Sequence, residues 1–180
     1  IALYDRKLED KGGRFGFSVE GASAIVSDDY SNPVTKVGGN ISFKYYLSPG
    51  LNLNLGGGYF ELENEGTYKN QFLSYDLSIG YDILPYDNLS PFLYAGVGSA
   101  VGQEPALKEI HVKLQYGGGI EYLPTRKFGI KIFAEQNFLL DDDIEGLVQG
   151  KWNDLYWRIG MGLNFYFGKP YKKVKSVMFE

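Results

Sequence analysis

Residues 154–168 read DLYWRIGMGLNFYFG, and side chains along this stretch alternate in character with a period of two. One face carries seven apolar residues: Leu155, Trp157, Ile159, Met161, Leu163, Phe165 and Phe167. The other face is polar or small: Asp154, Tyr156, Arg158, Gly160, Gly162, Asn164 and Tyr166. Successive side chains of a strand point to opposite faces, so the pattern predicts a strand between two unlike environments.

This strand is long for a globular protein, in which strands usually have about 5–6 residues. A strand tilted by about 45° needs roughly 9–11 residues to cross a bilayer. Aromatic residues stand at both ends of the apolar face and aliphatic residues between them, an order typical of a membrane-spanning strand with its rings at the two interfaces. The stretch therefore predicts the closing strand of an outer-membrane β-barrel.

The composition of the 180 residues agrees with a single small barrel. The chain has 24 Gly, 15 Tyr and 12 Phe but no Cys, which excludes disulfides and thiolate chemistry. Mean hydropathy is −0.23, a value that a barrel with a polar interior reaches in spite of its apolar outer face. The net charge of −4 does not favour a nucleic-acid partner, which needs a basic surface.

Similar alternation recurs along the chain and predicts seven further strands. These lie at about 14–25, 35–47, 51–62, 73–83, 92–102, 112–122 and 128–138. The faces of 92–102 are too apolar and glycine-rich to assign, and residues 61–70 are interpreted as a charged loop. We therefore expect an all-β fold, an eight-stranded antiparallel up-and-down transmembrane β-barrel over residues 14–168.

The connections alternate in length and chemistry. Those after the first, third, fifth and seventh strands are acidic and mostly longer, and those after the second, fourth and sixth are short and contain Pro. Outer-membrane barrels have long external loops and short periplasmic turns. We expect extracellular loops around Asp29, Thr67, Glu104 and Asp142, a periplasmic lead-in over residues 1–13 and a basic periplasmic tail over residues 169–180.

Charged residues occupy the predicted inward face. They are Glu20, Lys44, Asp76, Lys113, Glu121, Lys131, Glu135 and Arg158. The interior of a barrel of this size is filled by its own side chains, and buried charges must be paired. We interpret the set as a structural polar network, with a narrow proton or ion path as the alternative.

No catalytic, cofactor or metal site is predicted. His111 is the sole histidine, and Lys113 stands two residues along the same face. A lipid esterase needs a nucleophile beside its histidine. Asp141–Asp143 lack the spacing of a calcium loop. The triplets Gly56–Gly58 and Gly117–Gly119 are not followed by a phosphate-binding helix and are interpreted as bends.

The blocks KYYLSP, SPFLYAGVG, GGGIEYL and GLNFYFG, taken in order, resemble the small OmpA-like outer-membrane β-barrel family over residues 14–168. More narrowly, YYLSPGLNLNLGG, GLVQGKWNDLYW and NFYFGK resemble barrel domains that follow a curli-type secretion channel. The outer-membrane lipid A deacylases, which the chain resembles only in architecture, place a serine where Lys113 stands.

Together these features predict a non-enzymatic barrel in the outer membrane of a Gram-negative bacterium. It would serve as a membrane anchor and binding scaffold, in contact with outer-membrane lipid and lipopolysaccharide. The narrower resemblance implies an accessory role beside a protein partner in a secretion or surface-assembly complex. The alternatives are a lipid-modifying barrel enzyme that uses His111, a narrow porin, and a soluble lipocalin-like carrier, which would need an apolar interior.

Overall fold

A computed structural model describes residues 11, 13–26, 33–34, 36–64, 68–102, 110–140 and 155–169. Its strands are β1 (Phe15–Val26), β2 (Pro33–Val34), β3 (Lys36–Tyr46), β4 (Leu51–Asn64), β5 (Tyr68–Asp82), β6 (Leu89–Gly102), β7 (Ile110–Thr125), β8 (Phe128–Leu139) and β9 (Leu155–Phe167). In this part of the chain eight strands are long, and β2 is a two-residue strand that pairs with the end of β4. None of the described residues forms a helix long and apolar enough to span a membrane.

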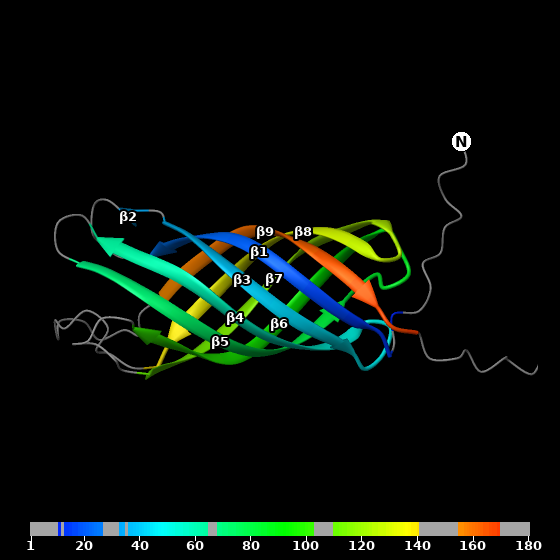
Figure 1. Cartoon of the computed structure of the whole chain (residues 1–180), viewed down its shortest axis with the longest axis horizontal. Coiled ribbons are helices and arrows are strands. Elements are labelled where there is room, and N and C mark those ends of the chain that lie inside the picture. Colours follow the sequence, from blue (N-terminus) through cyan, green and yellow to red (C-terminus); the bar gives the residue numbers. More distant parts are fainter. Residues whose placement is uncertain are drawn as a thin grey trace, which may run out of the picture.

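The eight long strands of the described chain form one closed antiparallel sheet (Figure 1). Long strands that follow one another in the chain pair with each other. β1 also pairs with β9, from Phe15 opposite Phe167 to Val26 opposite Tyr156. Closure gives each long strand a partner on both sides, so no edge strand is left unpaired. The predicted up-and-down barrel and the closing position of the last strand are confirmed.

The chain enters β1 and leaves β9 at the same end of the barrel, here called the terminal mouth (Figure 1). The turns 47–50, 83–88 and 126–127 also lie at this end. The ends of β1, β4, β6 and β8 lie at the opposite end, here called the loop mouth. The segments 103–109 and 141–154 are longer than the turns at the terminal mouth, as predicted, but residues 65–67 are fewer than those of turns 47–50 and 83–88, because β4 and β5 extend further than expected.

The predicted charged loop over residues 61–70 is wrong for most of its length. β4 continues to Asn64 and β5 begins at Tyr68, with Glu61 paired to Gln71. Polar residues are compatible with paired strands wherever a barrel wall extends beyond the apolar layer, because water can solvate them there. The loss of apolar alternation marks the edge of that layer here, not the end of the strand.

The wall exposes apolar side chains on its outer face. In β9, Met161 is 67% exposed and Ile159 54%, whereas Arg158 and Asn164 are buried. Soluble proteins rarely expose apolar surface as one continuous patch, and a band around a closed barrel is the surface that lipid covers. Near the terminal mouth the rings of Phe15 and Phe167 stack with centroids 5.9 Å apart, as expected for an interfacial aromatic girdle.

The faces of β6 become clear in the structure. Leu93 and Val97 face outward, while Phe92 is buried and Tyr94 partly buried inside. A Cβ atom on Gly117 would lie 2.8 Å from the Tyr94 ring, and one on Gly119 would lie 2.8 Å from the Phe92 ring. The glycine run of β7 therefore makes room inside the barrel for two rings of the neighbouring strand.

Candidate functional site in the barrel interior

The polar side chains of the interior form three groups along the barrel. A terminal cluster consists of Lys11, Tyr46, Asp82, Glu121, Asn164 and Tyr166; a middle group of Glu20, Asn40, Ser42, Lys44 and Lys131; and a loop-side cluster of Asp76, Tyr94, Lys113, Glu135, Asn137 and Arg158. All eight residues of the predicted network lie in these groups with their side chains directed inward. Alternation in the strands places them there, because every second residue of a barrel strand faces the interior.

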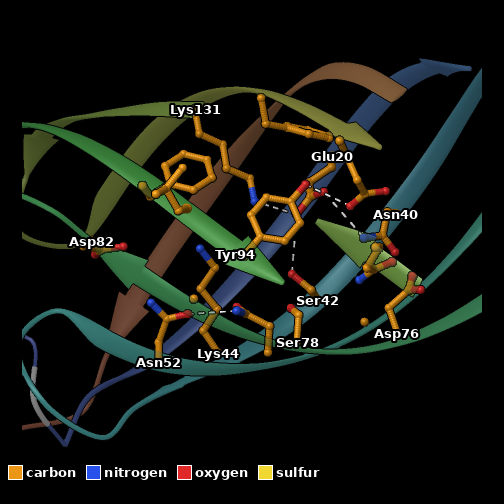
Figure 2. Close-up of a pocket in the computed structure, with 18 residues that line it drawn as sticks. Glu20, Asn40, Ser42, Lys44, Asn52, Asp76, Ser78, Asp82, Tyr94 and Lys131 are labelled. Atoms are coloured by element: carbon orange, nitrogen blue, oxygen red, sulfur yellow. Dashed lines mark hydrogen bonds and ion pairs between the residues drawn. The ribbon is translucent and has the colours of Figure 1, made fainter. Parts of the chain in front are cut away.

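The middle group is built on an ion pair between β1 and β8. The Lys131 ammonium lies 2.6 Å from a Glu20 carboxylate oxygen, and Asn40 and Ser42 donate hydrogen bonds of 3.5 Å to the same carboxylate (Figure 2). Lys44 lies nearby with its ammonium 5.8 Å from the centroid of the Phe92 ring. The carboxylate thus joins three strands, β1, β3 and β8, across the interior.

Glu135 is the centre of the loop-side cluster. One carboxylate oxygen accepts hydrogen bonds from Arg158 Nη1 at 3.0 Å and Asn137 Nδ2 at 2.9 Å. The other accepts a hydrogen bond of 2.8 Å from the Tyr94 hydroxyl. The Glu135 and Arg158 side chains are 6% and 7% exposed, so the ion pair is held away from water. A buried charge needs such a set of partners to offset its lost hydration.

The same cluster continues through Lys113. Its side chain is fully buried, and its ammonium lies 2.7 Å from Asp76 and donates a 3.1 Å hydrogen bond to Asn137 Oδ1. His111, one inward position closer to the loop mouth, is 4% exposed. No hydrogen bond joins His111 to a serine among the described residues, and Lys113 occupies the place of a nucleophile.

The terminal cluster surrounds a residue that precedes the first strand. The Lys11 ammonium lies 2.7 Å from Asp82 and 3.5 Å from Glu121, and its side chain is 2% exposed. It also lies 5.4 Å and 5.2 Å from the ring centroids of Tyr46 and Tyr166. Burial alone would lower the pKa of the Lys11 ammonium, but Tyr46, Glu121 and Asp82 raise that pKa above its ordinary value.

Apolar side chains close the interior toward the loop mouth. Phe60 stacks on Phe72 at 5.4 Å and on Tyr156 at 5.6 Å between ring centroids, and Ala100 and Leu139 complete the cluster. Around Lys44 a cavity of about 60 Å³ remains. This is room for a few water molecules and not for a continuous channel. The three polar groups and this apolar cluster therefore occupy the interior at successive levels along the described part of the barrel.

Sequence reasoning missed part of this network. Tyr94 could not be predicted as an inward residue, because the sequence of β6 does not alternate clearly. Asp82 follows the inward pattern of β5, but its contact with Lys11 at the terminal mouth is seen only in the structure. Lys11 carries no signal, because it stands before the alternating region. The described residues contain no group of His, Asp and Glu side chains that could hold a metal ion. The predicted acidic run Asp141–Asp143 lies outside them.

A closed barrel with an apolar outer wall and a filled polar interior defines the class of small transmembrane β-barrels. Neither a scan of protein-family models nor a search of curated proteins found a match to the sequence. Solved structures do match. Neisserial surface protein A superposes with a TM-score of 0.66 at 16% identity, covering 85% of this chain and 97% of that one.

Two further structures share the fold. The N-terminal barrel domain of Pseudomonas aeruginosa OprF has a TM-score of 0.55 at 18% identity, covering 84% of this chain and 97% of its own. The outer membrane enzyme PagL has a TM-score of 0.51 at 13% identity, covering 82% and 98%. At these identities the likeness establishes the fold alone. None of the three supports the narrower resemblance to barrels associated with a curli-type channel.

Proposed function

We propose that the protein is a non-enzymatic outer-membrane barrel that serves as a membrane anchor and binding scaffold. The observation that carries this proposal is the combination of an exposed apolar wall with an interior filled by ion pairs and rings. Lipid is the environment that such a wall requires. Because the described side chains occupy much of the interior, we assign contacts with other molecules to the loops and the outer wall.

The proposed orientation places the loop mouth outside the cell and the terminal mouth in the periplasm. Short turns at the terminal mouth and longer connections such as 103–109 and 141–154 at the loop mouth support it. The partners on this account are outer-membrane lipid and lipopolysaccharide, together with a protein that contacts the loops or the terminal segments. In the accessory form of the proposal, that protein partner belongs to a secretion or surface-assembly complex.

The lipid-modifying enzyme and the narrow porin receive less support. His111 is buried inside the barrel, with Lys113 at the next inward position, and a lipid ester outside the wall has no route to it. The stacked rings of Phe60, Phe72 and Tyr156 stand in the path of an ion moving along the axis. PagL, a barrel of the same fold that is an outer membrane enzyme, shows that the fold itself does not decide between these activities.

Orientation is tested by surface labelling, for which the absence of Cys from the chain is convenient. Single cysteines at Thr67 and Asp142 are expected to react with a membrane-impermeant maleimide on intact cells. Cysteines at Asp87 and Arg126, in exposed turns at the terminal mouth, are the matched controls and should react only after the outer membrane is permeabilised. The reverse pattern would contradict the proposed topology.

The scaffold role is tested by purification from membranes in a mild detergent, followed by identification of co-purifying chains. We expect a defined partner in constant proportion to the barrel. A single 20.2 kDa species with lipid alone would contradict the accessory form of the proposal and leave the anchor form.

A further inference from the structure

Two carboxylates and two tyrosines surround one ammonium at the terminal mouth. Asp82 lies at the end of β5 and Glu121 near the end of β7, with side chains 4% and 3% exposed. Tyr46 and Tyr166 lie at the ends of β3 and β9, with ring centroids 6.0 Å apart in an edge-to-face arrangement. An aromatic pair beside carboxylates is the chemistry that recognises an ammonium, through charge and through the faces of the rings.

Each wall of this cage is fixed by hydrogen bonds that do not involve Lys11. The Tyr46 hydroxyl donates to Asp82 at 3.2 Å. The Tyr166 hydroxyl and Asn164 Nδ2 both donate to Glu121. These bonds hold the two carboxylates in place without neutralising them. The strands therefore arrange the cage, and its direct ion-pair partner lies outside them.

That partner is Lys11, outside the barrel strands. Lys44, on β3, also attracts Asp82 and Glu121 electrostatically, but among the described residues only Lys11 forms an ion pair with them. The carboxylates of Glu20, Asp76 and Glu135 pair with cations on the strands. Two buried carboxylates without a cation would repel each other and would also lose their hydration. Lys11 is therefore the cation that offsets this cost by direct contact with both carboxylates.

The backbone around Lys11 shows how the lysine is held. The Gly13 amide donates to the Tyr46 carbonyl at 2.7 Å, and the Arg14 amide donates to the Lys11 carbonyl at 2.9 Å. Gly13 has φ of +80°, a conformation that glycine adopts without strain. The chain thus turns sharply at Gly13 and directs the Lys11 side chain back into the barrel. The Arg14 guanidinium donates to the Arg126 carbonyl at 2.9 Å and attaches this turn to the β7–β8 turn at the same mouth.

We propose that the terminal mouth is an ammonium-binding site which the protein fills with its own Lys11, so that this residue latches the entering chain to the barrel and closes its end. The lysine acts as a tethered ligand, bound through Asp82, Glu121 and two tyrosine rings. An emptied site would accept a free primary alkylammonium ion, because the cage recognises the head group and not the chain that carries it.

The experiment compares Lys11→Ala with the wild type by urea unfolding in detergent, with and without n-propylammonium chloride. Removal of the lysine should lower the folding equilibrium constant roughly a hundredfold or more, the loss typical of a buried pair left without one partner. Propylammonium should restore stability to the variant in a saturable way, and sodium chloride at equal ionic strength should not. Lys127→Ala, an exposed lysine at the same mouth, is the matched control and should neither lose stability nor respond.

If Lys11→Ala does not fold, Lys11→Cys provides a second test. The unfolded variant is alkylated with 2-bromoethylamine, which restores an ammonium at nearly the length of lysine, or with iodoacetamide, which leaves a neutral side chain. The proposal predicts refolding to near wild-type stability only with the ammonium. Equal stability of the two adducts would overturn it, as would an unaltered Lys11→Ala or a rescue that sodium chloride matches.

Discussion

Glu135→Leu is expected to destabilise the barrel by about 3–5 kcal/mol, the cost of removing one partner of a buried ion pair. The substitution leaves the Arg158 guanidinium, 7% exposed, without its carboxylate. It also removes the acceptor of the Tyr94 hydroxyl and of the Asn137 amide. The measurement is urea unfolding in detergent, followed by tryptophan fluorescence, to which Trp157 on the outer wall contributes.

A second substitution separates charge from packing. Combining Glu135→Leu with Arg158→Met replaces the pair by apolar side chains of similar size, which commonly restores stability or improves it. We therefore expect the double variant to be more stable than Glu135→Leu alone. Asp87→Asn, at an exposed turn carboxylate, is the control and should leave stability unchanged. A double variant as unstable as the single one would show that Glu135 acts by shape and not through its charge.

Leu55→Arg is expected to cost about 2–4 kcal/mol, the penalty for an arginine at the midplane of a bilayer on the outer face of a barrel. Leu55 is 64% exposed and lies midway along the outward residues of β4, paired with Phe43 and Leu77 on the neighbouring strands. In water the same substitution at an exposed position would change the free energy of unfolding by less than about 0.5 kcal/mol. The size of the loss therefore reports whether lipid or water surrounds the wall.

The matched control for Leu55→Arg is Tyr86→Arg. Tyr86 is 43% exposed and belongs to the turn at the terminal mouth, where the penalty should fall to about 0–1 kcal/mol. Both variants are unfolded from lipid vesicles under the same conditions. Equal costs at Leu55 and Tyr86, or a gain at Leu55, would mean that lipid does not surround this part of the barrel.

The fold could be predicted from the sequence because a barrel wall separates lipid from the interior. Residues that face these two environments alternate along each strand. In β9 the alternation from Trp157 to Phe167 identified the lipid face, the inward face and the closing position of the strand. The prediction is incomplete where apolar and polar residues do not alternate. In β6 the small inward residues Gly96 and Gly98 hide the polar face, and the extension of β4 to Asn64 lies beyond the apolar layer.

The polar interior could be predicted only as a set of inward residues. Which carboxylate meets which cation depends on the register of strands far apart in the chain, and register cannot be obtained from alternation. Glu20 and Lys131 are 111 residues apart in sequence, yet they form a 2.6 Å ion pair across the interior. Lys11 escaped prediction for a different reason, because a residue outside the strands has no alternating neighbours to indicate where it points.

The central claim is that lipid surrounds the outer wall while the interior is closed to it. It is tested most directly by placing a spin label at single cysteines along β9, from Trp157 to Phe167, in lipid vesicles. The account predicts that odd-numbered positions are accessible to oxygen dissolved in the bilayer and not to a water-soluble nickel complex, while even-numbered positions are protected from both. Odd-numbered positions that are accessible to the nickel complex, or an accessibility that does not alternate, would contradict it.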